Sequence, residues 1–576
     1  MSYIIKNNFV QYLGSKLLMA GTFASLPLIA IQTSAQVTSD ESARNEIEVI
    51  VVTAERREQS ILEAPLSITA FDSKMMEELQ ITSNKDLEVR TPGLQFGLDS
   101  PATIRGIGGL LNRNGGDLSV ATYSNDLYFD EAYGVVGSLY DIDRVEILRG
   151  PQGTLYGRNS VAGAINYINK RPQKEFDMGV LAEVGNENAM RFAGYVTGPL
   201  SEGLSYRLTA EWRDSDGFQE NISGPDASTR EDWSVSPQLR FQNENWDINL
   251  RYSHFEEDAR GDLVVPIGIP DPSNEFHINP VDGSPTENAN QYYLFPFTRP
   301  IATRGNDLEN KLDLNDVGRD IVERDAINFH INYSINENVG LTYILGDSKL
   351  DFCMCGSDAD ESGIKPSSDN PYVSEYGSTN YINGYINPYF TRDITSHELR
   401  LSIDTDRFNG IIGYYEFSED LVNDFNLFDR ADEGANTALG SIEVMGMPGE
   451  EFLPMMFGAS WPLELMPGIS LNPNTGDGKF YREYTARKYA SNAVFAQGRF
   501  QVTEQLGLVA GIRYTDDEKS TTETFQRISG NDIFGFFEGG LFYPYTVSID
   551  GEPRSYESDK VTWTLTAEYT TPSQNL

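Results

Sequence analysis

The stretch Asp141–Pro172 reads DIDRVEILRGPQGTLYGRNSVAGAINYINKRP and combines a short strand, a tight turn and a run of small residues. Apolar residues alternate with charged ones over Arg144–Leu148, which predicts a strand with Val145 and Ile147 on one side. A turn follows at Gly150–Gly153, because glycine allows backbone conformations that other residues avoid and proline fixes its own. The small residues after the turn favour close packing, so the stretch predicts a tightly folded segment of mixed structure.

A different pattern begins at Asp177, where the sequence becomes a series of alternating segments of about ten residues. In residues 204–213 every second residue is apolar, and the residues between them are polar or charged. A side-chain period of two places these two sets on opposite faces of a β-sheet. The same alternation recurs at 235–242, 246–253, 327–335, 506–514 and 563–569.

The connections between these segments distinguish a membrane barrel from a soluble β-sandwich, because both kinds of sheet alternate. Tight turns and long loops rich in Gly, Asn, Asp and Pro follow one another strictly. This order is typical of outer-membrane barrels, which have short periplasmic turns and long extracellular loops. The tight turns are expected at 199–203, 243–245, 335–338, 404–406 and 503–505, and the long loops at roughly 214–232, 257–322, 350–390, 418–486 and 517–558.

The composition is compatible with such a barrel. Hydrophobic residues make up only 39% of the 576 residues, but a barrel needs apolar residues only at every second position of its strands. The 30 Tyr and 30 Phe suit the aromatic girdles at the two membrane interfaces. The formal net charge of -42 repels phosphate backbones, so we expect no nucleic-acid partner.

The first 35 residues have the features of an export signal. Lys6 and Lys16 supply positive charge ahead of an apolar run over Leu17–Ile31, and Thr33–Ala35 offers small residues for cleavage. The apolar run has about fifteen residues, which is short for a membrane-spanning helix of roughly twenty. We therefore expect an exported protein whose mature form has no transmembrane helix.

The stretch Asp141–Pro172 resembles, almost residue for residue, the plug-domain signature of TonB-dependent outer-membrane receptors of the iron-complex or siderophore type. It departs mildly from that family at Tyr167, at Asn169 and over 127–133. Three shorter matches precede it in the expected order, at 64–69, 91–94 and 104–108. The candidate functional residues that the resemblance assigns to the plug are Arg105, Gly106, Arg144, Glu146, Arg149, Gly150, Pro151, Gly153, Tyr156, Gly157, Arg158, Asn159, Gly163 and Asn166.

Residues 36–60 are polar and charged around one apolar patch, and this patch resembles the TonB box, the segment that TonB of the inner-membrane energising complex seizes. Its β-branched run suits an extended strand, and its capture would be strand addition, in which main-chain hydrogen bonds give the affinity. An ordinary first strand of the plug is the alternative interpretation. The predicted box consists of Glu48, Val49, Ile50, Val51, Val52, Thr53 and Ala54.

The resemblance implies an all-β transmembrane barrel, of about 22 antiparallel strands in the family, with an N-terminal α+β plug domain in the lumen. We count about 12 strands here and expect about ten more beyond Leu576, so the barrel would be incomplete at its C-terminal end. Arg149 and Arg158 would face acidic residues of the wall, with purely local salt bridges as the alternative. The expected domains are a signal peptide (1–35), a periplasmic segment with the TonB box (36–60), a plug (61–172) and a partial barrel (177–576).

The function that the resemblance implies is import of a scarce solute across the outer membrane, where the protein would be a multi-pass β-barrel. A ferric siderophore is the favoured cargo, and a saccharide, cobalamin or another bulky nutrient is the alternative. The expected partners are TonB, outer-membrane lipid and the small-molecule cargo, and we expect a monomer. A passive porin is a rival from another class, but it would need neither plug nor box. The long loops carry no motif that identifies the substrate-binding residues.

The sequence contains no convincing catalytic or metal-binding constellation, so we expect no enzyme, no cofactor and no metal site. No HExxH, Walker or GxSxG pattern occurs, and Asp214–Gly217 lacks the remaining ligands of a calcium loop. Cys353 and Cys355 form no disulfide framework, and both a local disulfide and a pair of loop thiols remain open. The four His residues are scattered, at His254, His277, His330 and His397.

Overall fold

The computed structural model divides the protein into two units, residues 1–49 and 50–576, and the first lies outside the described residues. The predicted signal peptide, Glu48, Val49, Ile50 and Ala54 therefore lie outside the described residues as well. No described helix is long and apolar enough to cross a membrane. The described residues are 51–96 (without 54–55, 57–58 and 62–65), 102–108, 118–129, 138–221, 225–261, 311–312, 317–358, 384–429, 443–444, 447–448, 479–527, 547–551 and 553–569.

A five-stranded mixed sheet with two short helices forms the N-terminal part, in the strand order β3-β8-β9-β6-β7. Strands β6 and β9 run parallel, and the other neighbours are antiparallel. The bounds are β3 (Ser67–Asp72), α2 (Ser73–Glu78), α3 (Asn84–Arg90), β6 (Val120–Ser124), β7 (Leu127–Phe129), β8 (Ile142–Arg149) and β9 (Gly163–Asn169), with the short pairs β1 (Val51–Val52) and β2 (Gln59–Ser60), and β4 (Leu94–Gln95) and β5 (Thr103–Ile104).

Strand β8 separates two apolar cores of this sheet. Val145 and Ile147 lie on one side as predicted, packed with α2 and α3, whereas Leu148 points into the other core. Both helices begin at residues that cap them: the Asp72 carboxylate accepts the Met75 N–H, and Ser83 forms a capping box. The segment that carries the glycine-rich motif thus supplies two adjacent inner strands of the plug sheet, β8 and β9, and the turn between them.

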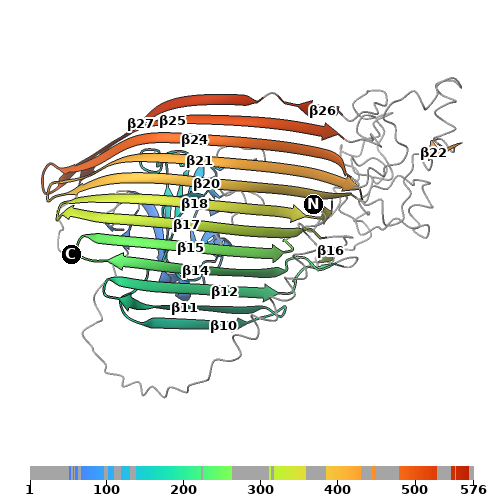
Figure 1. Cartoon of the computed structure of the whole chain (residues 1–576), viewed down its shortest axis with the longest axis horizontal. Coiled ribbons are helices and arrows are strands. Elements are labelled where there is room, and N and C mark those ends of the chain that lie inside the picture. The colour runs from blue at the N-terminus through green and yellow to red at the C-terminus, as the bar shows by residue number, and fades with distance from the viewer. Residues whose placement is uncertain are drawn as a thin grey trace, which may run out of the picture. The chain divides into compact units, whose positions relative to one another are not determined.

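Residues from Asp177 onward form one antiparallel 14-stranded sheet whose strands follow the sequence order from β10 to β25 (Figure 1). Two of the fourteen, β19 and β26, are short, which leaves the twelve long strands that the sequence predicts. The strands of this wall are β10 (Asp177–Val184), β11 (Met190–Ser201), β12 (Leu204–Ser215), β14 (Arg230–Gln242), β15 (Trp246–Ala259), β17 (Arg319–Asn336), β18 (Val339–Cys355), β19 (Ser357–Asp358), β20 (Gly384–Asp404), β21 (Phe408–Asp429), β24 (Lys479–Gln501), β25 (Leu506–Arg527), β26 (Val547–Asp550) and β27 (Arg554–Tyr569).

The wall exposes its apolar face and buries its charged face, the reverse of a sheet in a soluble protein. In β12, Leu208 and Trp212 are 43% and 36% exposed, whereas Arg207 and Glu211 between them are 1% and 3% exposed. The apolar row therefore faces outward, and the charged row faces the plug. This is the arrangement of a barrel with a lipid-facing apolar surface and a polar lumen, so the predicted fold class is confirmed.

Eleven of the twelve long wall strands, all except β10, exceed the ten residues predicted, so this prediction is wrong. Strand β24 has 23 residues, and β18 continues to Cys355, well inside the expected loop at 350–390. On the outer face of β18, Asp347, Lys349 and Asp351 continue the two-residue spacing where apolar residues stop. Main-chain pairing does not need apolar side chains, so the strands continue past the apolar belt.

The two cysteines lie in a strand, not in a loop. Cys353 and Cys355 form a disulfide at the end of β18, which decides between the two possibilities that the sequence left open. Two further short pairs lie between wall strands: β13 (Glu220–Asn221) with β16 (Lys311–Leu312), and β22 (Glu443–Val444) with β23 (Met447–Pro448).

Truncation of a buried side chain on β8 tests the placement of the plug core. We expect Ile147→Ala to destabilise the plug by about 2–5 kcal/mol, because Ile147 is fully buried and its loss leaves a cavity. The urea midpoint for protease cleavage of the plug in detergent-solubilised protein measures this change. The control is Val161→Ala, since Val161 is 63% exposed and its loss should change stability by no more than about 0.5 kcal/mol. Equal midpoints for the two variants would contradict the burial of β8.

Candidate functional site

The end of the predicted TonB box is built into the plug. Val51 and Val52 form β1 and pair with Ser60 and Gln59 of β2. The Val52 side chain is fully buried in the core that contains Leu148. The structure thus gives these two residues the place of a first strand, and their role as a TonB box stays a prediction.

Thr53, directly after β1, is held by a buried carboxylate of β8. Glu146 is fully buried, and its Oε1 accepts the Thr53 N–H at 2.7 Å and the Thr53 hydroxyl at 3.0 Å. The same oxygen accepts from Arg144 Nε at 2.8 Å, so the buried charge is compensated. Burial opposes the charge on Arg144, but Glu146 outweighs it and raises the pKa of the Arg144 guanidinium. Two motif residues, Arg144 and Glu146, thus anchor the predicted box.

Arg56 carries the second anchor of the same segment. Its guanidinium forms an ion pair with Asp126 and lies over the rings of Tyr123 and Tyr156, 5.0 Å and 4.5 Å from their centroids. Asp126 sits in the two-residue turn between β6 and β7, where Asn125 and Asp126 both have positive φ, as in a type I′ hairpin turn. The N-terminal segment therefore contacts both the β6–β7 hairpin, through Asp126, and the motif stretch Asp141–Pro172, through Tyr156.

The ion pair extends from the plug into the wall. Arg400 of β20 lies 3.8 Å from the Asp126 carboxylate, and its Nε donates to Glu398 at 2.5 Å. Burial disfavours both charges of the Arg56–Asp126 pair. Even so, Arg56 and Arg400 hold the pKa of Asp126 well below its usual range, and Glu398 and Asp126 raise the pKa of Arg56. The network therefore remains ionised at neutral pH and links the N-terminal segment to a wall strand.

A further set of polar contacts fixes the plug to the wall near the start of β8. Asp141 accepts from both Arg207 Nε, at 2.6 Å, and Arg207 Nη2, and from the Thr209 hydroxyl at 2.6 Å. Beside the β6–β7 turn, Asn328 and His330 of β17 contact the carbonyl oxygens of residues 124 and 125 at 3.2 Å and 2.9 Å. These polar contacts lie beside an apolar cluster in which Tyr128 of the plug packs against Phe417 of the wall.

The two arginines that the resemblance directs toward wall carboxylates lie in different surroundings. Arg149 donates to the Thr69 hydroxyl of the plug at 2.6 Å. Arg158 lies over Tyr489 of the wall, 3.6 Å from the ring centroid, and interacts electrostatically with Glu419 of β21. The roles of both residues stay predictions.

Two motif glycines are required by geometry. Gly163 has a φ of +155°, and a Cβ there would lie 2.1 Å from the Leu148 carbonyl oxygen of the neighbouring strand. Gly157 has a φ of +76° and contacts the Arg513 guanidinium of β25, which a Cβ would approach to 2.8 Å. Any side chain at either position would disturb the sheet or its contact with the wall.

The remaining motif residues lie in the turns and strands around β8 and β9. Arg105 and Gly106 form a turn with positive φ, and the Gly150 N–H donates to the carbonyl of residue 162. Tyr156 is buried, and its carbonyl accepts from the Tyr123 hydroxyl. The others are Pro151 and Gly153 in the turn after β8, Asn159, whose Nδ2 donates to Tyr128, and Asn166, buried in β9.

Sequence reasoning missed the residues that join the plug to the wall. Arg56, Asp126 and Arg400 are far apart in the sequence, and no motif contains them. One local signal was available for Asp126, because Asn125-Asp126 between two β-prone runs is a hairpin-turn sequence. Asp141 belongs to the stretch Asp141–Pro172, but its contact with Arg207 depends on how the plug packs against the wall, and no local sequence pattern shows this.

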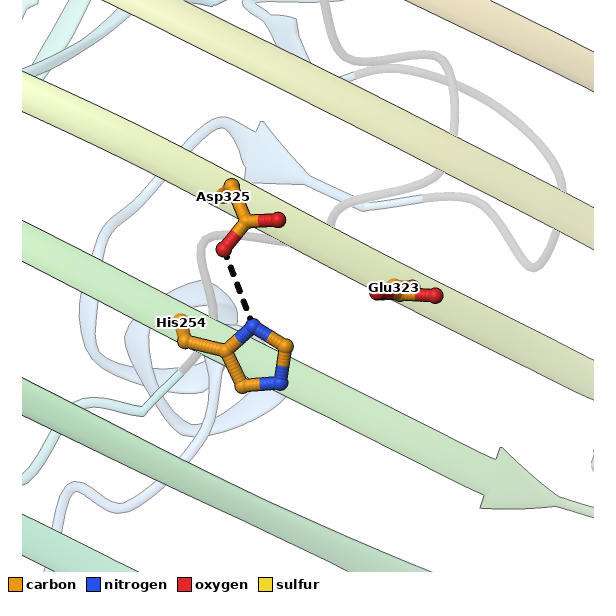
Figure 2. A group of neighbouring side chains, drawn as sticks. All are labelled: His254, Glu323 and Asp325. Atoms are coloured by element: carbon orange, nitrogen blue, oxygen red, sulfur yellow. Dashed lines mark hydrogen bonds and ion pairs between the residues drawn. The ribbon is translucent and has the colours of Figure 1, made fainter. Parts of the chain in front are cut away.

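A group of possible metal ligands lies on the outer face of the wall, and the sequence did not predict it. Figure 2 shows His254 pointing toward Asp325, with Nδ1 and Oδ1 3.0 Å apart, while Glu323 lies farther along the strand of Asp325. The ligand atoms of all three lie within 4.8 Å of one another. Asp325 also accepts from the Tyr252 hydroxyl, so the pair is satisfied as a cross-strand contact without an ion.

Known proteins resemble this one in both parts. A family model described as TonB-dependent Receptor Plug Domain matches residues 60–164. The Iron-regulated outer membrane virulence protein of Vibrio cholerae serotype O1 is 29% identical over 231 residues, which cover 37% of this chain and 34% of the relative. The Vitamin B12 transporter BtuB of Photobacterium profundum is 23% identical over 338 residues, 56% of this chain and 53% of the relative. The matches thus span from about a third to about half of the length of these relatives.

The fold is that of solved receptors of the same kind. The ferric yersiniabactin uptake receptor FyuA from Yersinia pestis superposes with a TM-score of 0.61 at 14% identity, over 88% of this chain and 62% of that protein. Its likeness covers the plug and the wall together. Residues 60–164 thus match the plug family of TonB-dependent receptors, and the chain as a whole is similar in fold to a solved outer-membrane uptake receptor.

Proposed function

We propose that this protein imports a scarce solute across the outer membrane by TonB-dependent active transport. The observation that carries the proposal is the anchorage of the N-terminal segment. Within the predicted box, Thr53 is tied to the plug core through Glu146, and two residues beyond the box Arg56 is tied to the wall through Asp126 and Arg400. A pull on the box therefore acts first on these contacts.

The order of the anchors in the sequence gives the order in which a pull reaches them. Strand β1 has only two paired residues, so its main-chain hydrogen bonds offer little resistance by themselves. The load then passes to Thr53 and Glu146, and next to Arg56 and Asp126. Loss of the Arg56 contact leaves Asp126 with Arg400 alone, which loosens the β6–β7 turn against the wall. A path for the solute would open along this side of the plug.

The cargo we favour is a ferric siderophore complex. In support, one relative is named for its regulation by iron, and the structural neighbour FyuA takes up ferric yersiniabactin. Cobalamin is the second candidate, because the named vitamin B12 transporter matches a larger share of this chain than the iron-regulated relative does. The energising partner is TonB, which would add a strand to the predicted box.

Uptake with and without a functional box tests the proposal. We expect Val49→Pro to reduce energy-dependent uptake at least tenfold, to the level of cells without TonB, because proline removes a main-chain donor needed for strand addition. The measurement is uptake of radiolabelled ferric catecholate, hydroxamate and phenolate siderophores, and of cyanocobalamin, by iron-starved cells whose own receptors are deleted. The control is Thr38→Pro in the same N-terminal segment. Uptake of a solute that persists without TonB would point to a passive porin instead.

Loss of the first anchor should release the segment without unfolding the plug. We expect Glu146→Ala to increase hydrogen exchange of the amides at 51–53 and 59–60, because Thr53 loses both of its bonds to the carboxylate. Mass spectrometry of the solubilised receptor measures the exchange. Asp143→Ala is the matched control, since Asp143 also pairs with Arg144 but does not contact Thr53. Equal exchange in the two variants would show that Glu146 is not an anchor.

The second anchor should be insensitive to mild acid. Because the pKa of Asp126 is depressed, its contribution to stability is present above the usual Asp range and is lost only as the pH falls well below it. Asp126→Asn should therefore lower plug stability by about 3 kcal/mol, by a similar amount at pH 7 and pH 5. Urea titration followed by protease cleavage measures the difference. A destabilisation that vanished at pH 5 would contradict an ionised Asp126.

A further inference from the structure

A polar cavity separates the plug from the wall on the side of β12, β14, β15 and β17. Its volume is about 50 Å³, and it is partly open to solvent. On the plug side it is lined by the β6–β7 hairpin, at Ser124 and Phe129, and by the residues around Asp141. On the wall side it is lined by the inward-facing residues of the four strands.

The cavity exists because the wall carries small side chains there on four adjacent strands. Thr209 pairs with Ser236, and Ser253 pairs with Ala326. The register of β14 and β15 (Val235 with His254, Gln238 with Arg251) places Ser236 opposite Ser253. These four small side chains form one row across the wall, and of them Thr209 reaches the plug through its hydrogen bond to Asp141. Ser236 and Ser253 carry hydroxyl groups that can donate hydrogen bonds to a ligand.

Two guanidinium groups flank this row. Arg251 donates through Nη2 to the Ser236 hydroxyl at 2.9 Å, and its buried Nε has no hydrogen-bond partner among the described residues. Arg324 is 7% exposed, and its Cζ lies 3.6 Å from the centroid of the Phe129 ring. Both arginines line the cavity.

The carboxylate that lines the cavity is already engaged. Asp141 accepts three hydrogen bonds, two from Arg207 and one from Thr209, so the charge of Arg207 balances it. The nearby Glu211 does not line the cavity and pairs with Arg191 at 2.6 Å. Among the described residues the lining therefore offers Arg251 no carboxylate except Asp141, which Arg207 already engages. A desolvated guanidinium donor whose nearby carboxylate is engaged elsewhere is unfavourable, and an anion that enters from solvent relieves this.

We propose that this cavity is a binding site for an oxyanion, the carboxylate or phosphate group of a small solute, held between Arg251, Arg324 and the hydroxyl row. Guanidinium groups bind both kinds of oxyanion through paired N–H donors, and Ser236 and Ser253 offer further donors. The site lies between plug and wall. It does not depend on the proposed import function, because binding can be measured without transport.

The test is direct binding to the receptor purified in non-ionic detergent, at low ionic strength and without chloride. Inorganic phosphate, citrate and acetate are titrated separately and followed by calorimetry. We expect at least one of them to bind, and Arg251→Gln to weaken that binding about tenfold or more, because a charged hydrogen-bond donor is lost. The strongest binder identifies the source: citrate indicates a polycarboxylate solute, and phosphate indicates a phosphorylated one.

Two further variants separate charge, space and folding. Ser253→Leu keeps both guanidinium groups but fills the cavity, and it should also abolish binding. Arg319→Gln removes the same charge at an exposed position on β17, where Arg319 pairs with Asp258, and it should leave binding unchanged. The proposal is overturned if none of the three anions binds at millimolar concentration, or if Arg251→Gln and Ser253→Leu bind as well as the unaltered receptor.

Discussion

The constraint on which this structure depends is that the wall buries its charged face. A sheet in lipid must turn its apolar residues outward, so the alternate residues, including Arg207, Glu211 and Arg324, are forced into the lumen. A desolvated guanidinium without a partner costs several kcal/mol. Arg207 finds its partner in Asp141 of the plug, so the plug supplies charges that the wall needs as well as filling its lumen.

The paired charges between plug and wall differ from an apolar core in how they respond to a pull. Buried ion pairs contribute little net stability, because their attraction is largely offset by the loss of hydration. They do impose a specific geometry, and when they separate next to water both partners are hydrated again. The cores around Val145 and Ile147 have no such compensation, because apolar surface that is exposed to water stays unfavourable. Work done on the N-terminal segment is therefore expected to affect the plug–wall contacts before it affects the centre of the plug.

The sequence was sufficient to predict the architecture, but it was not sufficient to predict the contacts between plug and wall. Alternation in residues 204–213 predicts the sheet, and the order of short and long connections predicts that its apolar face is outside. Strand ends were misplaced because Asp347, Lys349 and Asp351 keep the strand spacing while they lose its apolar character. The motif located Glu146 and Gly163, whose roles are local to one sheet. It could not locate Arg56, Asp126 and Arg400, because their meeting depends on long-range packing that leaves no local pattern.

The β6–β7 hairpin connects the N-terminal anchor with the cavity. Its turn residue Asp126 holds Arg56, while Ser124 and Phe129 on its two strands line the cavity beside Arg324. A displacement of the hairpin changes both environments at once, because the turn and its two short strands form one unit. If an anion in the cavity favours one position of the hairpin, the Arg56 contact must favour or oppose that same position by an equal free energy, since coupling between two sites is reciprocal. The short distance along one hairpin thus gives the solute and the N-terminal segment a physical means of sensing each other.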